Sequence, residues 1–493
     1  MTELGYQSAT TLTEKIQQRE IRSVEVLDAL VARMEKHNDG INAVVATNLD
    51  AARARAEAAD AALENGEVWG PLHGLPITIK DSYEVTGMPT TSGAPIFKEH
   101  YAKQHALTVQ RLVDAGAIVY GKTNLPIFAG DWQSYNKVYG TSCNPWDITR
   151  TPGGSSGGAA AALAAGLTSL ELGSDIGGSI RIPAHYCGVC GHKPSHGIIP
   201  MRGHIPGPPG TMAEPDLAVA GPMARTAEDL RLMLDVLKGP ATLDGAGWQL
   251  NLPASRHKSL QDFRVAVWWK ANDYPIDNEI ADAYAQLCTK LTDAGVTVAN
   301  VHPIKMDEIV PIYINLLGSV MGAGLPPSVR RTLPMMQLVT KGLRRLGRAS
   351  DMAVNYLDAF TLSHRDWMIT NERREKMRNR IGNFFKDYDV LLMPVTPTVA
   401  MPHNHEGQML QRTIEVNGKS RPYIDNMMWI ALATALGLPA TSAPVSQDAS
   451  GLPINIQIVG APYDDYTTIQ FAQCLAEVTG GFTPPPGYGD VGV

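Results

Sequence analysis

After residue 66 the sequence alternates between short apolar runs of strand length and amphipathic stretches of helical period. Strands that alternate with helices along a chain form a sheet whose faces the helices cover. The sequence therefore predicts an α/β fold with helices on both faces of the sheet. The predicted strands are Leu75–Ile79, Ala117–Tyr120, Thr168–Leu172, Val265–Trp269, Val390–Met393 and Ile454–Val459.

The N-terminal segment, about 1–66, has a different pattern and is predicted to be helical. Apolar residues recur at spacings of three and four after Ser23, which we predict to cap the first long helix. Helix-like sequence continues to Asn65 and ends at Gly66. Because no linker-like stretch and no internal repeat interrupts the chain, we predict one domain over residues 1–493.

Residues 303–360 are less regular and contain several methionines among glycines and prolines. Two interpretations stay open. The methionines fill the core, or they form a mobile wall over a binding pocket, since the methionine side chain adapts to varied shapes. The methionines are Met306, Met321, Met335, Met336 and Met352.

The composition excludes several classes of function. The 493 residues carry a formal net charge of −7, which indicates no basic surface for nucleic acid. Five cysteines in a chain of this length do not form a disulfide framework, and the N-terminus lacks the apolar core of a signal peptide. We therefore expect a cytoplasmic protein.

Neither a membrane span nor a metal site is predicted. The longest uncharged stretch, Asn426–Gln447, is interrupted by Gly437-Leu438-Pro439, which favours a helix, a turn and a strand. Cys187 and Cys190 have the spacing of half a zinc site, but no second pair accompanies them. We interpret these two cysteines as packing residues.

Two adjacent serines lie between glycines in residues 151–158, which read TPGGSSGG. The following Ala159–Ala165 is a strong helix former, so the serines lie at a helix N-terminus and not in a flexible linker. The Lys-Ser or Lys-Thr pair that ends a phosphate-binding loop is absent. Gly153–Gly157 matches the G-x-S-x-G elbow of α/β-hydrolases, but loop-forming residues precede it where the elbow needs a strand. An esterase of that type, using Ser155 or Ser156, stays the alternative.

A second glycine-rich loop follows the predicted strand Thr168–Leu172 and reads GSDIGGS from Gly173 to Ser179. Glycines allow successive backbone N–H groups to point inward, which forms a nest for an anion. Such a nest stabilises the oxyanion that develops when a nearby serine attacks a carbonyl group. A tight turn with an ordinary capping serine also explains this loop when it is taken alone.

A nucleophilic serine needs a base, and no histidine lies beside either loop in the sequence. Lys80 directly follows the apolar strand residues Ile77–Ile79. Burial at a strand end would lower the pKa of a lysine, so that the neutral amine could accept a proton. Taken alone, Lys80 fits a surface residue or a partner of Asp81 better than a catalytic base.

Together, these three segments resemble the amidase signature family. The spacing between Ser155 and Ser179 is that of the family, and the resemblance extends from about Gly70 to Ala476, weakest across 303–360. It implies a large mixed, twisted β-sheet covered by helices on both faces. The motifs that carry the resemblance are Gly74–Asp81 (GLPITIKD), Gly153–Gly158 (GGSSGG) and Asp175–Pro183 (DIGGSIRIP).

The resemblance implies a catalytic group of Lys80, Ser155 and Ser179. Ser179 would be the nucleophile and Lys80 the base, with Ser155 bridging them after a cis peptide bond from Gly154. The reaction would form an acyl-enzyme that water then hydrolyses, with no cofactor and no metal.

The residues around this group also have implied roles. The oxyanion would be bound by the N–H groups of four consecutive residues, which are Ile176, Gly177, Gly178 and Ser179. Ser156 and Asp175 would hold the two loops, and Arg181 would have a structural role.

The predicted substrate is a small molecule with an apolar or aromatic part. In this family, the glutamine-using amidotransferases grip the amino acid with an Arg and an Asp. Here Met427 stands at the Asp position, and no matching Arg precedes Thr361. The predicted substrate wall consists of a segment after Lys122-Thr123-Asn124 and a tryptophan near the C-terminus, namely Ala129, Gly130, Asp131, Trp132 and Trp429.

The predicted function is therefore a serine amidohydrolase that cleaves an amide, a carbamate or an aryl ester. A non-catalytic subunit that keeps the fold stays a further alternative. The sequence leaves open whether the chain forms a homodimer.

Overall fold

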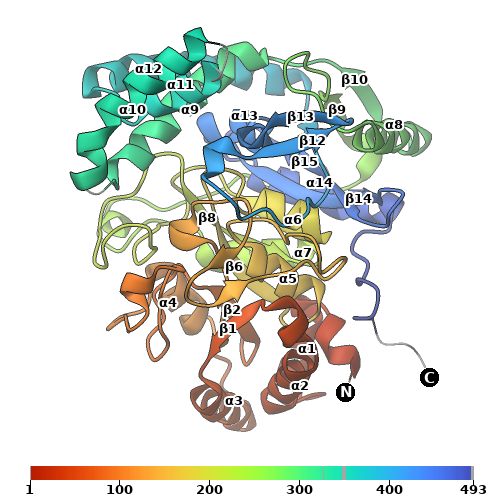
Figure 1. The fold of residues 1–493 in the computed structure, drawn as a ribbon. Helices are drawn as coiled ribbons and strands as arrows, with labels where there is room; N and C mark the ends of the chain where they lie inside the picture. The colour runs from red at the N-terminus through yellow and green to blue at the C-terminus, as the bar shows by residue number, and fades with distance from the viewer. Residues whose placement is uncertain (1, 326, 347–350, 490–493) are drawn as a thin grey trace.

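The computed structural model describes residues 2–325, 327–346 and 351–489, and its centre is one sheet of 11 strands (Figure 1). Their order is β1-β3-β2-β6-β8-β7-β14-β15-β11-β9-β10. Two short hairpins, β4–β5 and β12–β13, lie outside this sheet. The strands are β1 (Val44–Thr47), β2 (Pro76–Lys80), β3 (Ile118–Thr123), β4 (Tyr135–Asn136), β5 (Gly140–Thr141), β6 (Leu170–Asp175), β7 (Cys190–Lys193), β8 (Val219–Ala224), β9 (Arg264–Val267), β10 (Thr297–Asn300), β11 (Val390–Pro394), β12 (Thr413–Val416), β13 (Lys419–Pro422), β14 (Ala440–Gln447) and β15 (Pro453–Val459).

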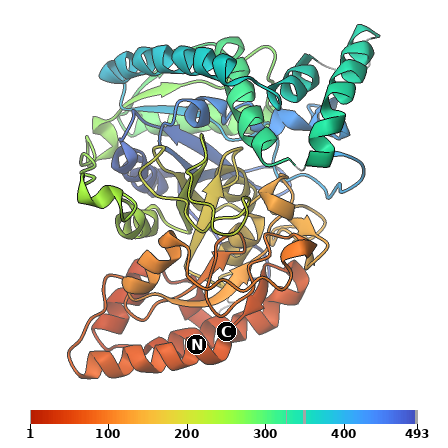
Figure 2. The same ribbon diagram turned by 90° about the vertical axis from the view of Figure 1, so that its left-hand side faces the viewer.

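Helices cover the sheet on both faces, so the predicted fold class is confirmed (Figures 1 and 2). The N-terminal helices lie at one end of the molecule, and α9–α12 lie at the other (Figures 1 and 2). The helices are α1 (Ala9–Gln17), α2 (Ser23–Ile41), α3 (Leu49–Glu64), α4 (Leu107–Asp114), α5 (Gly157–Ala164), α6 (Arg181–Cys187), α7 (Ala227–Leu237), α8 (Asn278–Asp293), α9 (Met306–Ala323), α10 (Pro327–Arg345), α11 (Asp351–Ala359), α12 (His364–Asp387), α13 (Ala431–Ala435) and α14 (Asp465–Thr479).

Parallel pairing in the middle of the sheet brings two of the predicted motifs together. β2 runs parallel to β6, with Thr78 opposite Glu171 and Ile79 opposite Leu172. The carboxyl ends of parallel strands meet at the same edge of a sheet. Lys80, at the end of β2, therefore lies beside the loop that follows β6.

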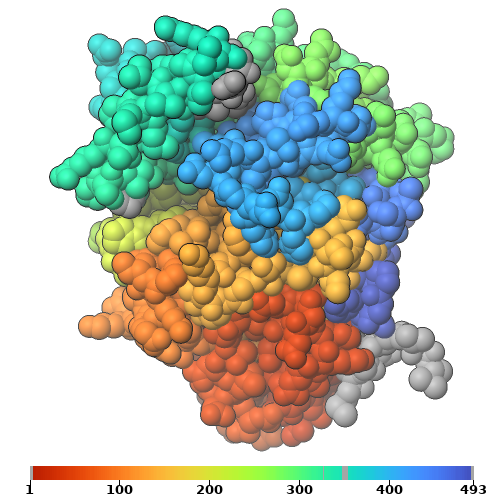
Figure 3. All heavy atoms as spheres, viewed as in Figure 1, coloured from red at the N-terminus to blue at the C-terminus, as the bar shows by residue number. Residues whose placement is uncertain are grey.

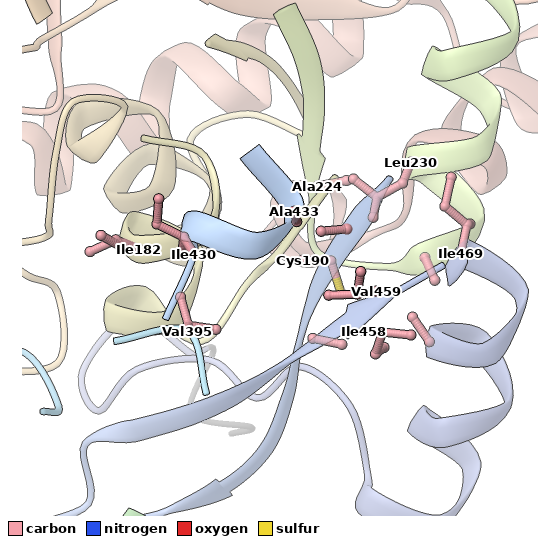
Figure 4. Close-up of a cluster of buried hydrophobic side chains, with 14 of the residues drawn as sticks. Ile182, Cys190, Ala224, Leu230, Val395, Ile430, Ala433, Ile458, Val459 and Ile469 are labelled. Atoms are coloured by element: carbon pink, nitrogen blue, oxygen red, sulfur yellow. The ribbon is translucent and has the colours of Figure 1, made fainter. Parts of the chain in front are cut away.

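The core is formed by apolar side chains on both sides of the sheet. Ile182 and Ile430 lie on one side of β15, and Leu230 and Ile469 lie on the other (Figure 4). The helix, turn and strand predicted across Asn426–Gln447 are present as α13, a turn and β14, all largely buried. No helix within the described ranges has both the length and the apolar character needed to cross a bilayer.

The N-terminal segment differs from the prediction in two ways. It contains a strand, β1, which pairs antiparallel with β3, so the segment is not wholly helical. Ser23 is the first residue of α2 and not its cap, because the N-cap is Arg22, whose backbone N–H donates to the Glu25 carboxylate at 2.8 Å. The backbone N–H of Ser23 instead donates to the Asp60 carboxylate at 2.7 Å.

The region 303–360 is largely helical, with α9, α10 and α11, although its residues 326 and 347–350 lie outside the described ranges. Two glycines permit the close contact of α9 with the chain around the end of α11. A Cβ added at Gly318 would lie 2.3 Å from the Ala359 Cβ, and one added at Gly322 would lie 2.2 Å from the Phe360 carbonyl oxygen.

The methionines of this region do not have one common role. Met306 is buried, whereas Met335 and Met336 are 65% and 38% exposed. Core filling therefore explains only part of the set. A mobile wall over a pocket stays a prediction, as does the single domain over residues 1–493.

The chain around β12 and β13 packs across the segments that follow β3 (Figure 3). Asp131 accepts hydrogen bonds from Arg412 at 2.7 Å and from the Tyr423 hydroxyl at 2.7 Å. The Gln133 amide donates to the Asn404 carbonyl at 2.7 Å. These contacts fix the segment 129–133, which lies next to the glycine-rich loops, against the C-terminal part of the chain.

Candidate active site

Lys80 is fully buried, and its amine hydrogen-bonds to three serine hydroxyls among the described residues. Its Nζ lies 2.7 Å from the Ser155 Oγ, 2.9 Å from the Ser156 Oγ and 3.0 Å from the Ser174 Oγ. Burial lowers the pKa of Lys80 to about 7, against the attraction of the Asp175 and Glu171 carboxylates. A large fraction of this amine is therefore neutral near pH 7 and able to accept a proton.

Ser155 is held in place by the close packing of its neighbours. The Gly154–Ser155 peptide bond is cis. A Cβ at Gly154 would lie 2.4 Å from the Asp131 carbonyl oxygen, so only glycine fits against the segment 131–133. Helix α5 begins directly after the serines, at Gly157, so they occupy a helix N-terminus as the sequence predicts.

Ser179 lies in the loop after β6, directly before α6, and is almost fully buried. The backbone N–H of Ser156 donates to the Ser179 carbonyl at 3.1 Å and joins the two serine loops. No hydrogen bond between the Ser155 and Ser179 hydroxyls is present among the described residues. Lys80 and Ser155 are thus in direct contact, and Ser179 is joined to them through the backbone of Ser156.

The four predicted oxyanion donors are not equivalent. The N–H of Gly178 donates to the Asp175 Oδ1 at 3.0 Å, so it already has an acceptor inside the loop. Its role as an oxyanion donor stays a prediction. Within the described part of the chain, the N–H groups of Ile176, Gly177 and Ser179 have no hydrogen-bond acceptor. These three donors are free to bind an oxyanion.

Aromatic side chains from three different segments donate to carbonyl groups of β6 and of the loop that follows it. The Tyr83 hydroxyl, the Tyr313 hydroxyl and the Trp132 indole N–H are the donors, at 2.7, 2.9 and 2.8 Å. The acceptors, in that order, are the carbonyl oxygens of Gly173, Ile176 and Gly177. Trp132, predicted as a substrate contact, therefore also holds the loop itself.

Asp175 and Arg181 form a buried ion pair behind the loop. The Arg181 Nη2 lies 2.8 Å from the Asp175 Oδ1, and the same arginine donates to the Gln457 side chain at 2.6 Å and to the Thr434 hydroxyl at 2.7 Å. The N–H of Ile180 also donates to Asp175, at 3.1 Å. Both residues therefore tie the loop to β15 and α13, which is the structural role that the resemblance implies.

The sequence reasoning missed two residues beside Lys80. One is Ser174, whose hydroxyl contacts the amine. The other is Glu171, which is fully buried and accepts a hydrogen bond from the Thr78 hydroxyl at 2.6 Å. Burial raises the pKa of Glu171 to about 7. A carboxylate between two leucines of a predicted buried strand was the signal that could have found it.

The predicted substrate wall is in part occupied by internal contacts. The Asp131 carboxylate is paired with Arg412 and hydrogen-bonded to Tyr423. The place of Asp131 in the wall of a substrate pocket stays a prediction. Trp429 is fully buried, edge-on to Trp268 with ring centroids 5.9 Å apart. Its indole N–H has no acceptor among the described residues.

The other predicted wall residues lie at the surface next to the site. Ala129 is half-buried with φ of 56°, and Gly130 is exposed. Both belong to the segment that continues into Trp132 and therefore borders the loop after β6. Their contact with a substrate stays a prediction.

The two cysteines of the C-x-x-C sequence point to different partners. Cys187 donates to the Pro152 carbonyl at 3.5 Å and Cys190 to the Arg225 carbonyl at 3.7 Å, and both are buried. Their contacts are those of packing residues. In the ranges that the structure describes, no group of three or more His, Cys, Asp or Glu side chains is arranged to hold a metal ion.

Known proteins resemble this chain over nearly its whole length. Fatty-acid amide hydrolase 2 of Homo sapiens is 31% identical over 506 residues, covering 97% of this chain and 90% of that protein. A glutamyl-tRNA(Gln) amidotransferase component of Carboxydothermus hydrogenoformans is 30% identical over 513 residues, covering 97% of this chain and 98% of that protein. A solved bacterial aryl acylamidase of the amidase signature enzymes has a TM-score of 0.79 and 24% identity over 96% of each chain, which shows a shared fold.

The family model described as Amidase matches residues 25–469. This range contains all three motif segments and both serine loops. The solved aryl acylamidase has the same fold as the sheet and helices described above. The chain therefore belongs to the amidase signature family, whose activity is the hydrolysis of amide bonds.

Proposed function

We propose that this protein is a serine amidohydrolase that cleaves the amide of a small apolar or aromatic substrate through an acyl-enzyme. The observation that carries the proposal is the buried Lys80 amine, 2.7 Å from the Ser155 hydroxyl. It meets three hydroxyls, and no carboxylate lies within ion-pair distance of it among the described residues. Such an amine is a base and not one half of a structural ion pair.

The proposed reaction moves one proton along a short relay. Neutral Lys80 takes the proton of Ser155, which takes the proton of Ser179 as the Ser179 Oγ attacks the substrate carbonyl. The carbonyl oxygen gains the negative charge, and the N–H groups of Ile176, Gly177 and Ser179 stabilise it. The C–N bond then breaks while Lys80 returns the proton through Ser155 to the leaving amine. Water attacks the acyl group by the same relay and regenerates Ser179.

The surroundings of Ser155 and Ser156 favour this mechanism over that of an α/β-hydrolase esterase. Both hydroxyls bond to Lys80, and neither bonds to a histidine in the described part of the chain. The chain before Ser155 is also irregular, whereas the elbow needs a strand that runs into its serine.

Hydrolysis is favoured over amide transfer by the residues near α13. The related proteins include both a fatty-acid amide hydrolase and an amidotransferase component. Met427, at the position that the amidotransferases fill with Asp, is buried. The nearby Asp425 is already paired with Arg421 at 2.6 Å. No free carboxylate is thus available at these two positions for an amino-acid substrate.

The proposal of an apolar or aromatic substrate is supported by Trp132, a predicted wall residue that lies against the nucleophile loop. Carbamates and aryl esters present the same carbonyl geometry, so we include them as substrates in the proposal. All five cysteines are free thiols, which supports the proposed cytoplasmic location.

The proposal is tested by a hydrolysis screen of aryl amides, fatty amides, carbamates and aryl esters. We expect turnover of at least one class, lost in Ser179→Ala, Ser155→Ala and Lys80→Met. The matched control is Ser169→Ala, since Ser169 is buried and its hydroxyl has no partner among the described residues. Full activity in Ser179→Ala contradicts the proposal. Failure of the intact protein both to hydrolyse any class and to react with a fluorophosphonate favours a non-catalytic subunit.

A further inference from the structure

The loop that carries the nucleophile is held by side-chain donors from two distant segments. The Tyr313 hydroxyl, on α9, donates to the Ile176 carbonyl at 2.9 Å. The Trp132 indole N–H, from the segment after β3, donates to the Gly177 carbonyl at 2.8 Å. Neither contact could be expected from sequence spacing, because Tyr313 lies 137 positions from Ile176 along the chain.

Each bond fixes the orientation of one peptide plane. In a trans peptide the C=O and the N–H point in opposite directions, so a donor on one side determines where the other side points. The plane of the Ile176 carbonyl carries the Gly177 N–H, one of the three free donors. The next peptide plane joins the Gly177 carbonyl to the Gly178 N–H. Trp132 donates to that carbonyl, and Asp175 accepts from that N–H, so the plane is held at both ends.

The two donors are positioned to act without interference from water. Both side chains are buried, and a Cβ added at Gly177 would lie 3.8 Å from the Tyr313 hydroxyl oxygen and 3.9 Å from the Trp132 Nε1. They therefore flank Gly177 directly. Burial raises the pKa of Tyr313 well above its usual range, so its hydroxyl stays protonated and remains a donor.

We propose that Tyr313 and Trp132 are positioning residues that aim the Gly177 N–H at the developing oxyanion. This inference rests on the proposed function, because an oxyanion forms only if Ser179 attacks a carbonyl. A hydrogen bond to the Ile176 carbonyl also polarises the peptide and makes the Gly177 N–H a stronger donor.

The region 303–360 would then affect catalysis, because it contains Tyr313. Tyr313 lies on α9, and α9 is packed against the end of α11 at Gly318 and Gly322. The helices at that end of the molecule therefore determine the geometry of the oxyanion site, in addition to any wall that they form.

The experiment measures the reaction of a fluorophosphonate with the full-length protein, since this probe needs no known substrate. Its phosphoryl oxygen gains charge as the serine attacks, as a carbonyl oxygen does. We expect Tyr313→Phe and Trp132→Phe each to lower the maximal labelling rate by roughly 10-fold to 100-fold, less than the loss of a whole oxyanion donor. In Tyr313→Phe the concentration of probe giving half-maximal rate should not change, because ground-state binding does not use this hydrogen bond.

Matched controls separate positioning from general packing. The buried Tyr284 donates to the Asn455 carbonyl at 2.8 Å, and Trp146 donates to the Cys187 carbonyl at 3.0 Å, both outside the site. Tyr284→Phe and Trp146→Phe should therefore label at the wild-type rate. Thermal unfolding of every variant shows which ones are folded. If Tyr313→Phe does not fold, the labelling rate of Trp132→Phe alone tests the proposal.

Two results would overturn the inference, and only one of them also overturns the proposed function. If Ser179→Ala is not labelled but Tyr313→Phe and Trp132→Phe react within about twofold of wild type, the positioning role is wrong and the proposed function stands. If Ser179→Ala is labelled like the wild type, the proposed function itself fails and the inference fails with it.

Discussion

Two neighbouring strands of the sheet each carry a buried lysine, and the two lysines have opposite surroundings. Lys122 on β3 pairs with Asp81 at 3.0 Å and donates to the Tyr83 carbonyl at 2.8 Å. Lys80 at the end of β2 meets the hydroxyls of three serines. Burial lowers the pKa of both amines, and for Lys122 the Asp81 carboxylate opposes that effect from hydrogen-bond distance.

This difference separates a structural lysine from a base. A carboxylate partner stabilises the ammonium and keeps its proton in place. Hydroxyl partners donate and accept equally well, so they hold an amine in either protonation state. The type of partner, and not burial itself, therefore decides which of the two lysines is able to take part in proton transfer.

The largest effect should come from removing the base. We expect Lys80→Met to lower kcat by roughly 10⁴-fold or more, because the relay then has no proton acceptor. The variant should also be less stable than the wild type, because the three buried hydroxyls lose the amine to which they bond. Steady-state rates and thermal unfolding are measured together, and substantial turnover in a folded Lys80→Met protein would show that another group is the base.

Removing the paired lysine should instead destabilise the fold. Lys122→Met leaves the Asp81 carboxylate buried without its cation, which costs about 3–5 kcal/mol of unfolding free energy. Urea denaturation measures this loss. The double variant Lys122→Met with Asp81→Asn should recover part of it, whereas equal loss in both variants would mean that the ion pair is not the cause.

The pH dependence of the wild-type rate should report the free amine of Lys80. Its pKa is lowered to about 7, so the neutral base is lost as the pH falls through that value. We expect kcat/KM to be level above pH 7 and to fall by about 10-fold for each pH unit well below it. A rate that stays constant from pH 8 to about pH 5 would exclude Lys80 as the group that must be neutral.

The smallest effect should come from replacing Glu171, which lies on β6 close to Lys80. Its carboxylate raises the pKa of Lys80, so Glu171→Gln should lower that pKa and move the acidic limb of the rate profile to lower pH. Glu214→Gln is the control, since the pKa of Glu214 is also raised but its carboxylate does not act on Lys80. A limb that stays in place, or moves to higher pH, would show that Glu171 is uncharged or uncoupled in the working enzyme.

Much of the fold could be predicted because the relevant signals are local. The central strands were expected at Leu75–Ile79 and Thr168–Leu172 and are found at Pro76–Lys80 and Leu170–Asp175. Short apolar runs between glycines and prolines carry this information by themselves. Strand β1, with the sequence Val-Val-Ala-Thr, also has strand-like residues, but it was missed because it is only four residues long and lies between two helices. Its pairing with β3 shows that it is a strand.

Within the site, the limits of the sequence are equally specific. Gly178 was predicted as an oxyanion donor, and in the structure its N–H donates to the Asp175 side chain. Asp131 was predicted in the substrate wall, and in the structure its carboxylate pairs with Arg412, far along the chain. In both cases the deciding atom belongs to a side chain whose direction no local pattern encodes.

The sequence by itself determined the family, the motif positions of Lys80, Ser155 and Ser179, and the α/β class, because these depend on residue type, spacing and period along the chain. Only the tertiary structure decided which N–H groups of the loop are free, that Lys80 meets hydroxyls while Lys122 meets a carboxylate, and that Tyr313 reaches the Ile176 carbonyl. Hydrogen bonds form over about 3 Å in space. Packing brings such partners together from positions far apart in the chain, and that proximity is a property of the folded molecule.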